Sequence, residues 1–75
     1  MKKIDRLNIL GELGEKFKKA RLEKCISQTE LANKIGKDQP SINRLEKGNI
    51  NPSYLYLLEI CEGLEVNLAE ILTNY

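Results

Sequence analysis

Five side chains that could recognise nucleic-acid bases recur at helical spacing between residues 38 and 47. A helix drawn there at about 100° per residue gathers them on one side and leaves Ile42, Leu45 and Glu46 on the other. We call this group the polar face, and its members are Gln39, Pro40, Asn43, Arg44 and Lys47. Arg can bond guanine through two atoms, Gln or Asn can bond adenine, and a Pro ring can contact a thymine methyl. The polar face therefore suits base edges, although an ordinary solvated helix surface would show the same pattern.

The stretch before the polar face predicts a second short helix. Ser27 and Glu30 form an S-x-x-E capping box, and Gly36 ends the helical pattern that follows them. The N-terminus of this helix carries the positive end of its dipole, where backbone amides and the Gln28 side chain can face a phosphate backbone.

The helix that carries the polar face has start and stop signals of its own. Asp38 caps it, Pro40 is tolerated in its first turn, and Gly48 suits a left-handed C′ position. Two short capped helices joined by a tight turn form a helix-turn-helix, which we place at about residues 27–48.

Three further helices fit the rest of the chain, at about residues 9–24, 53–63 and 68–73, and Ser53 and Asn67 are the expected N-caps of the last two. Residues 1–8 are left as an N-terminal arm. No segment alternates with period two, so strands are not expected. We therefore predict a single all-α domain over residues 1–75, a compact bundle of five short helices.

Charge is divided unevenly along this 75-residue chain, whose net charge is only +1. Residues 16–47 hold nine Lys or Arg against four Asp or Glu, and residues 48–75 hold four Glu and no Lys or Arg. A basic middle followed by an acidic end is the distribution expected of a domain that offers one surface to phosphate.

The residue types argue against catalysis. There is no histidine, and the two cysteines lack the spacing of a metal site. We expect no enzyme activity, no cofactor, no metal and no disulfide. Without a signal-peptide pattern or an apolar run of membrane-spanning length, we expect a cytoplasmic protein that does not bind membranes.

Three segments together resemble the Cro and phage-repressor type of helix-turn-helix domain, the XRE-type transcriptional regulators. They are SQTELANKIG, PSINRLEKGNINPS and LEVNLAEIL, and the resemblance runs from about residue 14 to residue 72. It implies a lambda-repressor-like DNA-binding domain. It also implies that Gln28 contacts phosphate, that Asn43, Lys47 and Asn49 lie close to the DNA backbone, and that the base-reading residues are Gln39, Pro40 and Arg44.

The resemblance further implies an ion pair between Arg21 and Glu46. The helical wheel agrees, since it places Glu46 on the inner side beside apolar residues, and we interpret the pair as structural rather than catalytic. Two positions depart from the family pattern, because Cys25 and Glu65 stand where Gly is common. A left-handed conformation at either position would cost roughly 1 kcal/mol.

The helix at 53–63 is apolar on nearly all sides, which favours a homodimer. We assign the dimer interface to Tyr56, Ile60, Leu72 and Tyr75. The alternative is that the N-terminal arm covers this surface through Ile4 and Leu7. A dimer would place two copies of the polar face ~34 Å apart, the spacing for an inverted-repeat operator in double-stranded DNA.

The leading hypothesis is thus a dimeric, sequence-specific transcriptional regulator. Phage-type repressor, restriction–modification controller and antitoxin all fit the resemblance, and an antitoxin would also bind a toxin protein. A helical adaptor that binds proteins but not DNA is the alternative from another class.

Overall fold

The computed structural model describes residues 5–75, and this part of the chain contains helices and no strand. The five helices are α1 (Arg6–Glu23), α2 (Gln28–Ile35), α3 (Gln39–Glu46), α4 (Tyr54–Leu64) and α5 (Leu68–Asn74). The predicted all-α bundle of five helices is confirmed. Within the described residues, no helix has the length and apolar character that crossing a membrane requires.

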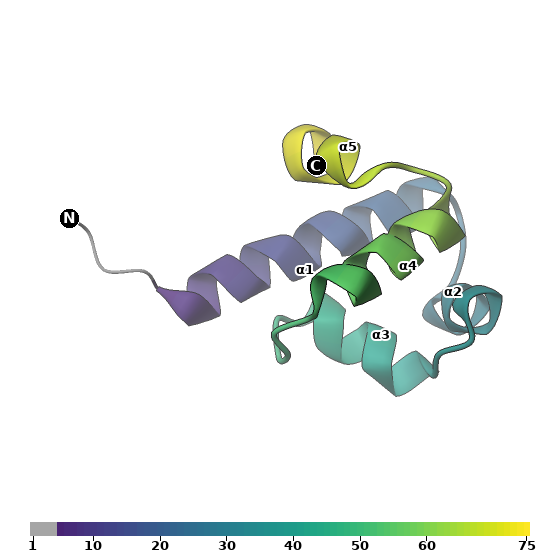
Figure 1. The fold of residues 1–75 in the computed structure, drawn as a ribbon, viewed down its shortest axis with the longest axis horizontal. Helices are drawn as coiled ribbons and strands as arrows, with labels where there is room; N and C mark the ends of the chain where they lie inside the picture. Colours follow the sequence, from purple (N-terminus) through teal and green to yellow (C-terminus); the bar gives the residue numbers. More distant parts are fainter. Residues whose placement is uncertain (1–4) are drawn as a thin grey trace.

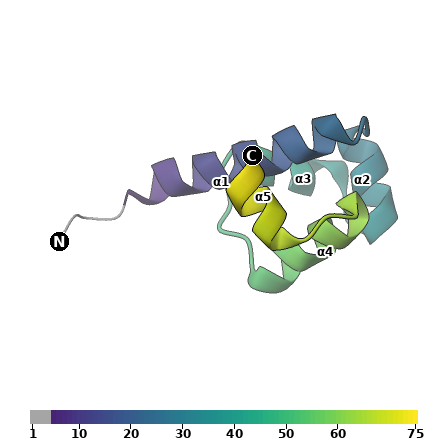
Figure 2. The ribbon, with the colours of Figure 1, turned by 90° about the horizontal axis from the view of Figure 1, so that it is seen from above.

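The long helix α1 forms the spine of the molecule (Figure 1). Helices α2 and α3 pack on each other, α3 also packs on α1, and α4 packs on α2. In the view of Figure 1, α5 lies above α1 and α3 lies below it, so these two helices occupy opposite sides of the bundle. The first turns of α1 extend beyond the other helices (Figures 1 and 2).

Every helix begins at a polar side chain that accepts a hydrogen bond from a backbone N–H of its first turn. Four of these N-caps were predicted, and they are Ser27, Asp38, Ser53 and Asn67. The fifth, Asp5, accepts from the backbone N–H of Asn8 and starts α1 at Arg6. The predicted arm is therefore wrong for residues 6–8, which are helical. Ile4 lies outside the described residues.

Helices α1 to α4 end in the same way, with one residue in the left-handed conformation. These residues are Cys25, Gly36, Gly48 and Glu65, with φ values of 59°, 69°, 73° and 58°. After each, the next backbone N–H bonds to a carbonyl five residues earlier, as Asn49 does to Arg44 at 2.9 Å. This is the Schellman motif, which satisfies the last carbonyls of a helix. Cys25 and Glu65 therefore adopt the left-handed conformation that costs a non-Gly residue roughly 1 kcal/mol.

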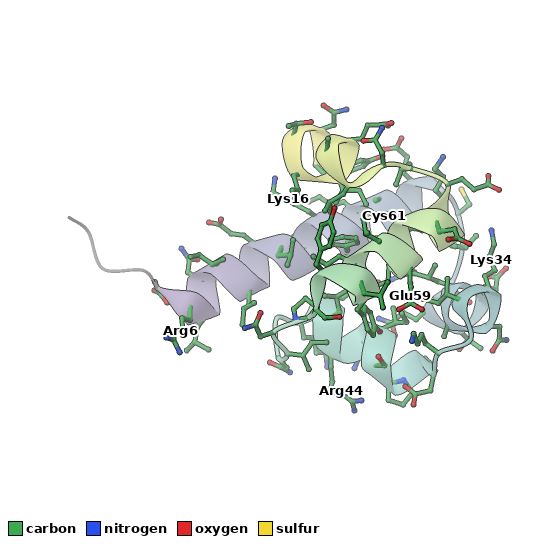
Figure 3. All side chains as sticks on the ribbon, viewed as in Figure 1. Arg6, Lys16, Lys34, Arg44, Glu59 and Cys61 are labelled. Atoms are coloured by element: carbon green, nitrogen blue, oxygen red, sulfur yellow. The ribbon has the colours of Figure 1, made fainter. Side chains whose placement is uncertain are left out.

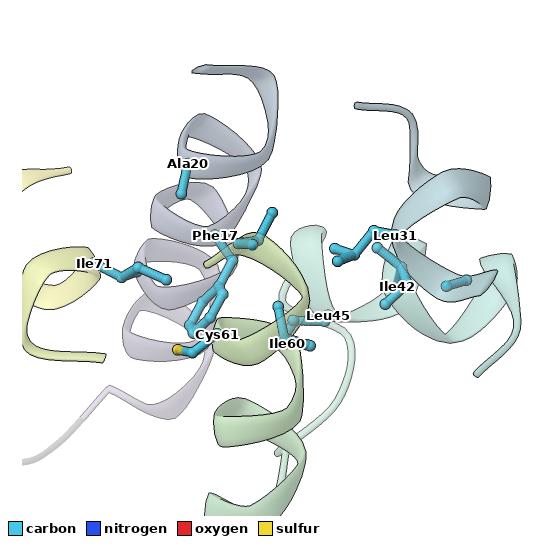
Figure 4. Close-up of a cluster of buried hydrophobic side chains, with 10 residues drawn as sticks. Phe17, Ala20, Leu31, Ile42, Leu45, Ile60, Cys61 and Ile71 are labelled. Carbon is cyan, nitrogen blue, oxygen red and sulfur yellow. The ribbon is translucent and has the colours of Figure 1, made fainter. Parts of the chain in front are cut away.

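The core lies between the five helices, each of which contributes buried side chains to it (Figure 4). Its buried apolar side chains are Phe17, Ala20, Leu31, Ala32, Ile42, Leu45, Ile60, Cys61, Leu64 and Ile71. Burial raises the pKa of the Cys61 thiol. This core fixes α2 and α3 relative to α1, and so it sets the position of the polar face.

A glycine lets α1 and α3 approach more closely than side chains would allow. A Cβ placed on Gly14 would lie 2.2 Å from the carbonyl oxygen of Leu45 and 2.7 Å from that of Glu46. The end of α3 is held in the same manner, since a Cβ on Gly48 would lie 2.7 Å from the Cα of Gly11. These contacts place α3 directly against α1, which is what brings Glu46 within reach of α1.

Candidate nucleic-acid interface

The polar face lies on the side of α3 that points away from the bundle. Pro40, Arg44 and Lys47 are exposed, and Gln39 and Asn43 are half-buried. Arg44 points outward from the lower edge of the molecule in Figure 3, on the side opposite α5. The exposed Asn49 follows α3 in the chain. The five side chains of the polar face are therefore at or near one surface.

The N-terminus of α2 is held by the predicted capping box. The Ser27 hydroxyl accepts from the Glu30 backbone N–H at 3.0 Å, and the Glu30 carboxylate accepts from the Ser27 backbone N–H at 3.0 Å. The hydrogen bonds from Ser27 lower the pKa of Glu30. The capping box leaves the backbone N–H groups of residues 28 and 29, the first two of the helix, for water or a ligand.

Gln28 connects α2 to α3 through its side-chain amide. Its nitrogen donates to Glu46 Oε1 at 3.0 Å and, through a longer contact of 3.3 Å, to Asn43 Oδ1. Its oxygen accepts from Gln39 Nε2 at 2.7 Å. Both N–H bonds of the amide are thus used inside the protein. Sequence reasoning placed Gln28 at the phosphate backbone and missed these partners, because residue spacing does not show contacts between helices.

Arg21 and Glu46 form a two-point ion pair between α1 and α3. Arg21 Nε donates to Glu46 Oε2 at 2.7 Å and Arg21 Nη2 donates to Glu46 Oε1 at 3.0 Å. Arg21 is 7% exposed and Glu46 is 6% exposed, so the charges are nearly removed from water. Arg21 Nη1 also donates to the carbonyl oxygen of Ile26 at 2.8 Å, which fixes the loop between α1 and α2.

Helix α4 supports α3 through a contact that the sequence did not indicate. The hydroxyl groups of Ser41 and Tyr56 share a hydrogen bond. Lys37 lies over the Tyr56 ring, 5.7 Å from its centroid, and pairs with Glu59 at 3.4 Å. Tyr56 is therefore occupied within the domain, although it was assigned to a dimer interface.

The other residues assigned to the dimer interface differ in exposure. Ile60 is 1% exposed and lies in the core, so its assignment is wrong. Tyr75 is half-buried, and its backbone oxygen accepts from Lys16 Nζ at 2.7 Å. Leu72 is 45% exposed. Leu7 is 80% exposed, so it does not cover α4. The alternative in which the N-terminal arm covers α4 is therefore wrong for Leu7.

Charge on the described structure follows the division seen in the sequence. The basic segment 16–47 contains α2, α3 and the C-terminal part of α1, whereas α4 and α5 lie in the segment without Lys or Arg. The polar face therefore belongs to the basic part of the molecule, and the acidic part lies with α4 and α5.

Comparisons with known proteins identify relatives of this chain. The helix-turn-helix family model HTH_3 matches residues 17–71. A protein of Sinorhizobium fredii, named an uncharacterized HTH-type transcriptional regulator y4dJ, is 33% identical over 61 residues, which are 81% of this chain and 79% of that protein. YqaE of Bacillus subtilis, also named an uncharacterized HTH-type transcriptional regulator, is 34% identical over 58 residues, which are 77% of this chain and 50% of that protein.

The fold is similar to those of restriction-modification controller proteins. C.AhdI from Aeromonas hydrophila superposes with a TM-score of 0.86 at 26% identity, over 91% of this chain and 99% of that one. C.Esp1396I, crystallised as a tetramer in complex with its natural 35 base-pair operator, gives a TM-score of 0.79 at 33% identity. That likeness covers 85% of this chain and 84% of the other.

Proposed function

Because the chain belongs to the helix-turn-helix family HTH_3, we propose that it is a sequence-specific regulator that binds operator DNA. The observation that carries the proposal is the polar face, which lies on the outer side of α3 with Pro40, Arg44 and Lys47 exposed and belongs to the basic part of the molecule. An α-helix fits the major groove of DNA, and the side chains on its outer side then meet base edges.

Within the polar face, we assign base contacts to Gln39, Pro40 and Arg44. The exposed Arg44 side chain suits two-point bonding to guanine, Pro40 suits a thymine methyl, and the Gln39 amide suits adenine. We assign phosphate contacts to Asn43, Lys47 and Asn49. The N-terminus of α2 meets the adjacent phosphate through its free backbone N–H groups, since the donors of the Gln28 side chain are committed within the protein.

We further propose that the protein binds DNA as a dimer. Its support is an exposed apolar surface on α4 and α5, where Tyr54 is 68%, Leu55 67%, Leu58 37% and Leu72 45% exposed. Small monomers seldom expose so many large apolar side chains on adjoining helices. Sedimentation at micromolar concentration tests this, with a dimer expected for the wild type and a shift toward monomer for Leu55→Glu. A wild type that remains monomeric at all concentrations contradicts it.

The similarity to C.AhdI and C.Esp1396I favours a controller of a restriction–modification operon among the possible regulatory roles. A titration of duplex DNA at increasing salt tests the proposed function against that of a protein-binding adaptor. Neutralising several phosphates releases counterions, so affinity should fall steeply as salt rises. Absence of binding at low salt, or binding that does not depend on salt, would favour the adaptor.

A further inference from the structure

We propose that the buried Arg21–Glu46 ion pair sets which atoms of Gln39 and Asn43 face the DNA, so that both residues of the pair act as positioning residues for base recognition. The ion pair acts through Gln28, which lies between it and the polar face. The effect of the ion pair on DNA recognition rests on the proposed function, whereas its effect on side-chain orientation holds in the free protein as well.

The orientation of these side chains starts from the Glu46 carboxylate, which can only accept hydrogen bonds. Both oxygens of Glu46 already accept from Arg21, at 2.7 and 3.0 Å. A carboxylate in such a pair has no proton to donate, whereas an amide side chain has a donor end and an acceptor end. Whatever amide approaches Glu46 must therefore present its nitrogen.

Gln28 is the amide that approaches, and the carboxylate fixes its orientation. Gln28 Nε2 lies 3.0 Å from Glu46 Oε1, so Gln28 Oε1 must point the other way. There it accepts from Gln39 Nε2 at 2.7 Å, which means that Gln39 must also present its nitrogen. The second N–H of Gln28 is directed at Asn43 Oδ1, 3.3 Å away, so Asn43 turns its oxygen inward.

The side-chain atoms that these hydrogen bonds do not use differ between Gln39 and Asn43. Gln39 keeps its carbonyl oxygen and one N–H, which are the two groups that pair with N6 and N7 of adenine. Asn43 keeps both of its N–H bonds, and these suit an acceptor such as a phosphate oxygen.

The opposite orientation of Gln28 would change this pattern. If Gln28 turned its nitrogen toward Gln39, Gln39 would use its oxygen for that contact and would be left with two N–H bonds. Two donors match the two acceptors of guanine and do not match adenine. A single buried charge pair, which joins residues 25 positions apart, thereby selects between two base preferences.

Two variants test the proposal. In Glu46→Gln the side chain at position 46 has nearly the same shape but can face Gln28 with either end, so the orientation is no longer fixed. In Gln28→Met the link is removed while Arg21 and Glu46 stay intact. Ile71→Val serves as the control, because it reduces packing at a buried residue of α5, on the other side of α1 from α3.

The first measurement is selection of bound duplexes from a random pool. In both variants, the preference at the base pair contacted by Gln39 should fall by about fivefold or more, while the preference at the pair contacted by Arg44 is kept. Ile71→Val should give the wild-type profile. An unchanged profile in both variants, or an equal loss at every base pair, would overturn the proposal.

The second measurement uses NMR of the free protein and does not depend on DNA binding. The side-chain NH₂ signals of Gln39 and Asn43 should shift in Gln28→Met and in Glu46→Gln, and should stay in place in Ile71→Val. Unchanged signals would overturn the proposal even if the wild type binds DNA. A wild type that selects no sequence would refute the proposed function instead, and these signals would still decide whether the ion pair orients the two amides.

Discussion

Replacing Glu46 by Ala removes the acceptor that holds Arg21 in the core. The change deletes the two hydrogen bonds from Arg21, at 2.7 and 3.0 Å, and the one from Gln28 at 3.0 Å. Removing one partner of a buried ion pair lowers the free energy of unfolding by about 3–5 kcal/mol, because the remaining charge stays buried without its partner. Arg21 keeps its bond to the Ile26 carbonyl, so we expect the lower end of this range, about 3 kcal/mol.

The assay is urea unfolding followed by far-ultraviolet circular dichroism. A domain of this size has a total stability of about 4–11 kcal/mol, so the variant should still fold in the absence of urea. A loss of about 3 kcal/mol corresponds to a melting temperature roughly 12–24 °C lower. The double variant Arg21→Met Glu46→Leu is the control, since an apolar pair in the same space should recover most of the loss. A loss below about 1 kcal/mol, the scale of an exposed pair, would refute the reasoning.

Four further predictions concern the polar face and the backbone. Arg44→Ala should weaken operator binding by about 1–3 kcal/mol and relax the preference at one base pair in a selection experiment. Lys47→Ala should weaken binding to all duplexes alike and reduce the slope of the salt dependence by about 1 in titrations. Cys25→Gly and Glu65→Gly should each stabilise the fold by about 1 kcal/mol in urea unfolding, because both positions have positive φ. Gly14→Ala should destabilise it by about 3 kcal/mol in the same assay, because the new Cβ would lie 2.2 Å from a carbonyl oxygen of α3.

The boundaries of most helices could be predicted because they depend on local signals. The caps at Ser27, Asp38 and Ser53 are short-range hydrogen bonds between a side chain and the backbone three residues later, and the sequence shows them directly. Asp5 makes the same bond, but the apolar stripe of α1 begins only near Ile9. The start of that helix was therefore placed too late.

Contacts between helices could not be predicted from the sequence in the same way. Helix α4 is apolar on nearly all sides, so a helical wheel does not show that Ile60 faces the core while Leu55 faces outward. The bonds that Gln28 makes join α2 to side chains of α3, and they depend on how these two helices pack, which residue spacing does not reveal. The exposure of Arg44 was predictable because it follows from the amphipathic pattern of a single helix.

The most direct test of the central claim is to select duplexes from a random pool with the wild-type protein and to compare them with those that Arg44→Ala selects. The wild type should enrich an inverted repeat whose half-sites are about one helical turn apart. Arg44→Ala should lose the preference at one base pair of each half-site. No enrichment by the wild type, or the same enriched sequence from Arg44→Ala, would contradict the claim that α3 of this protein reads DNA.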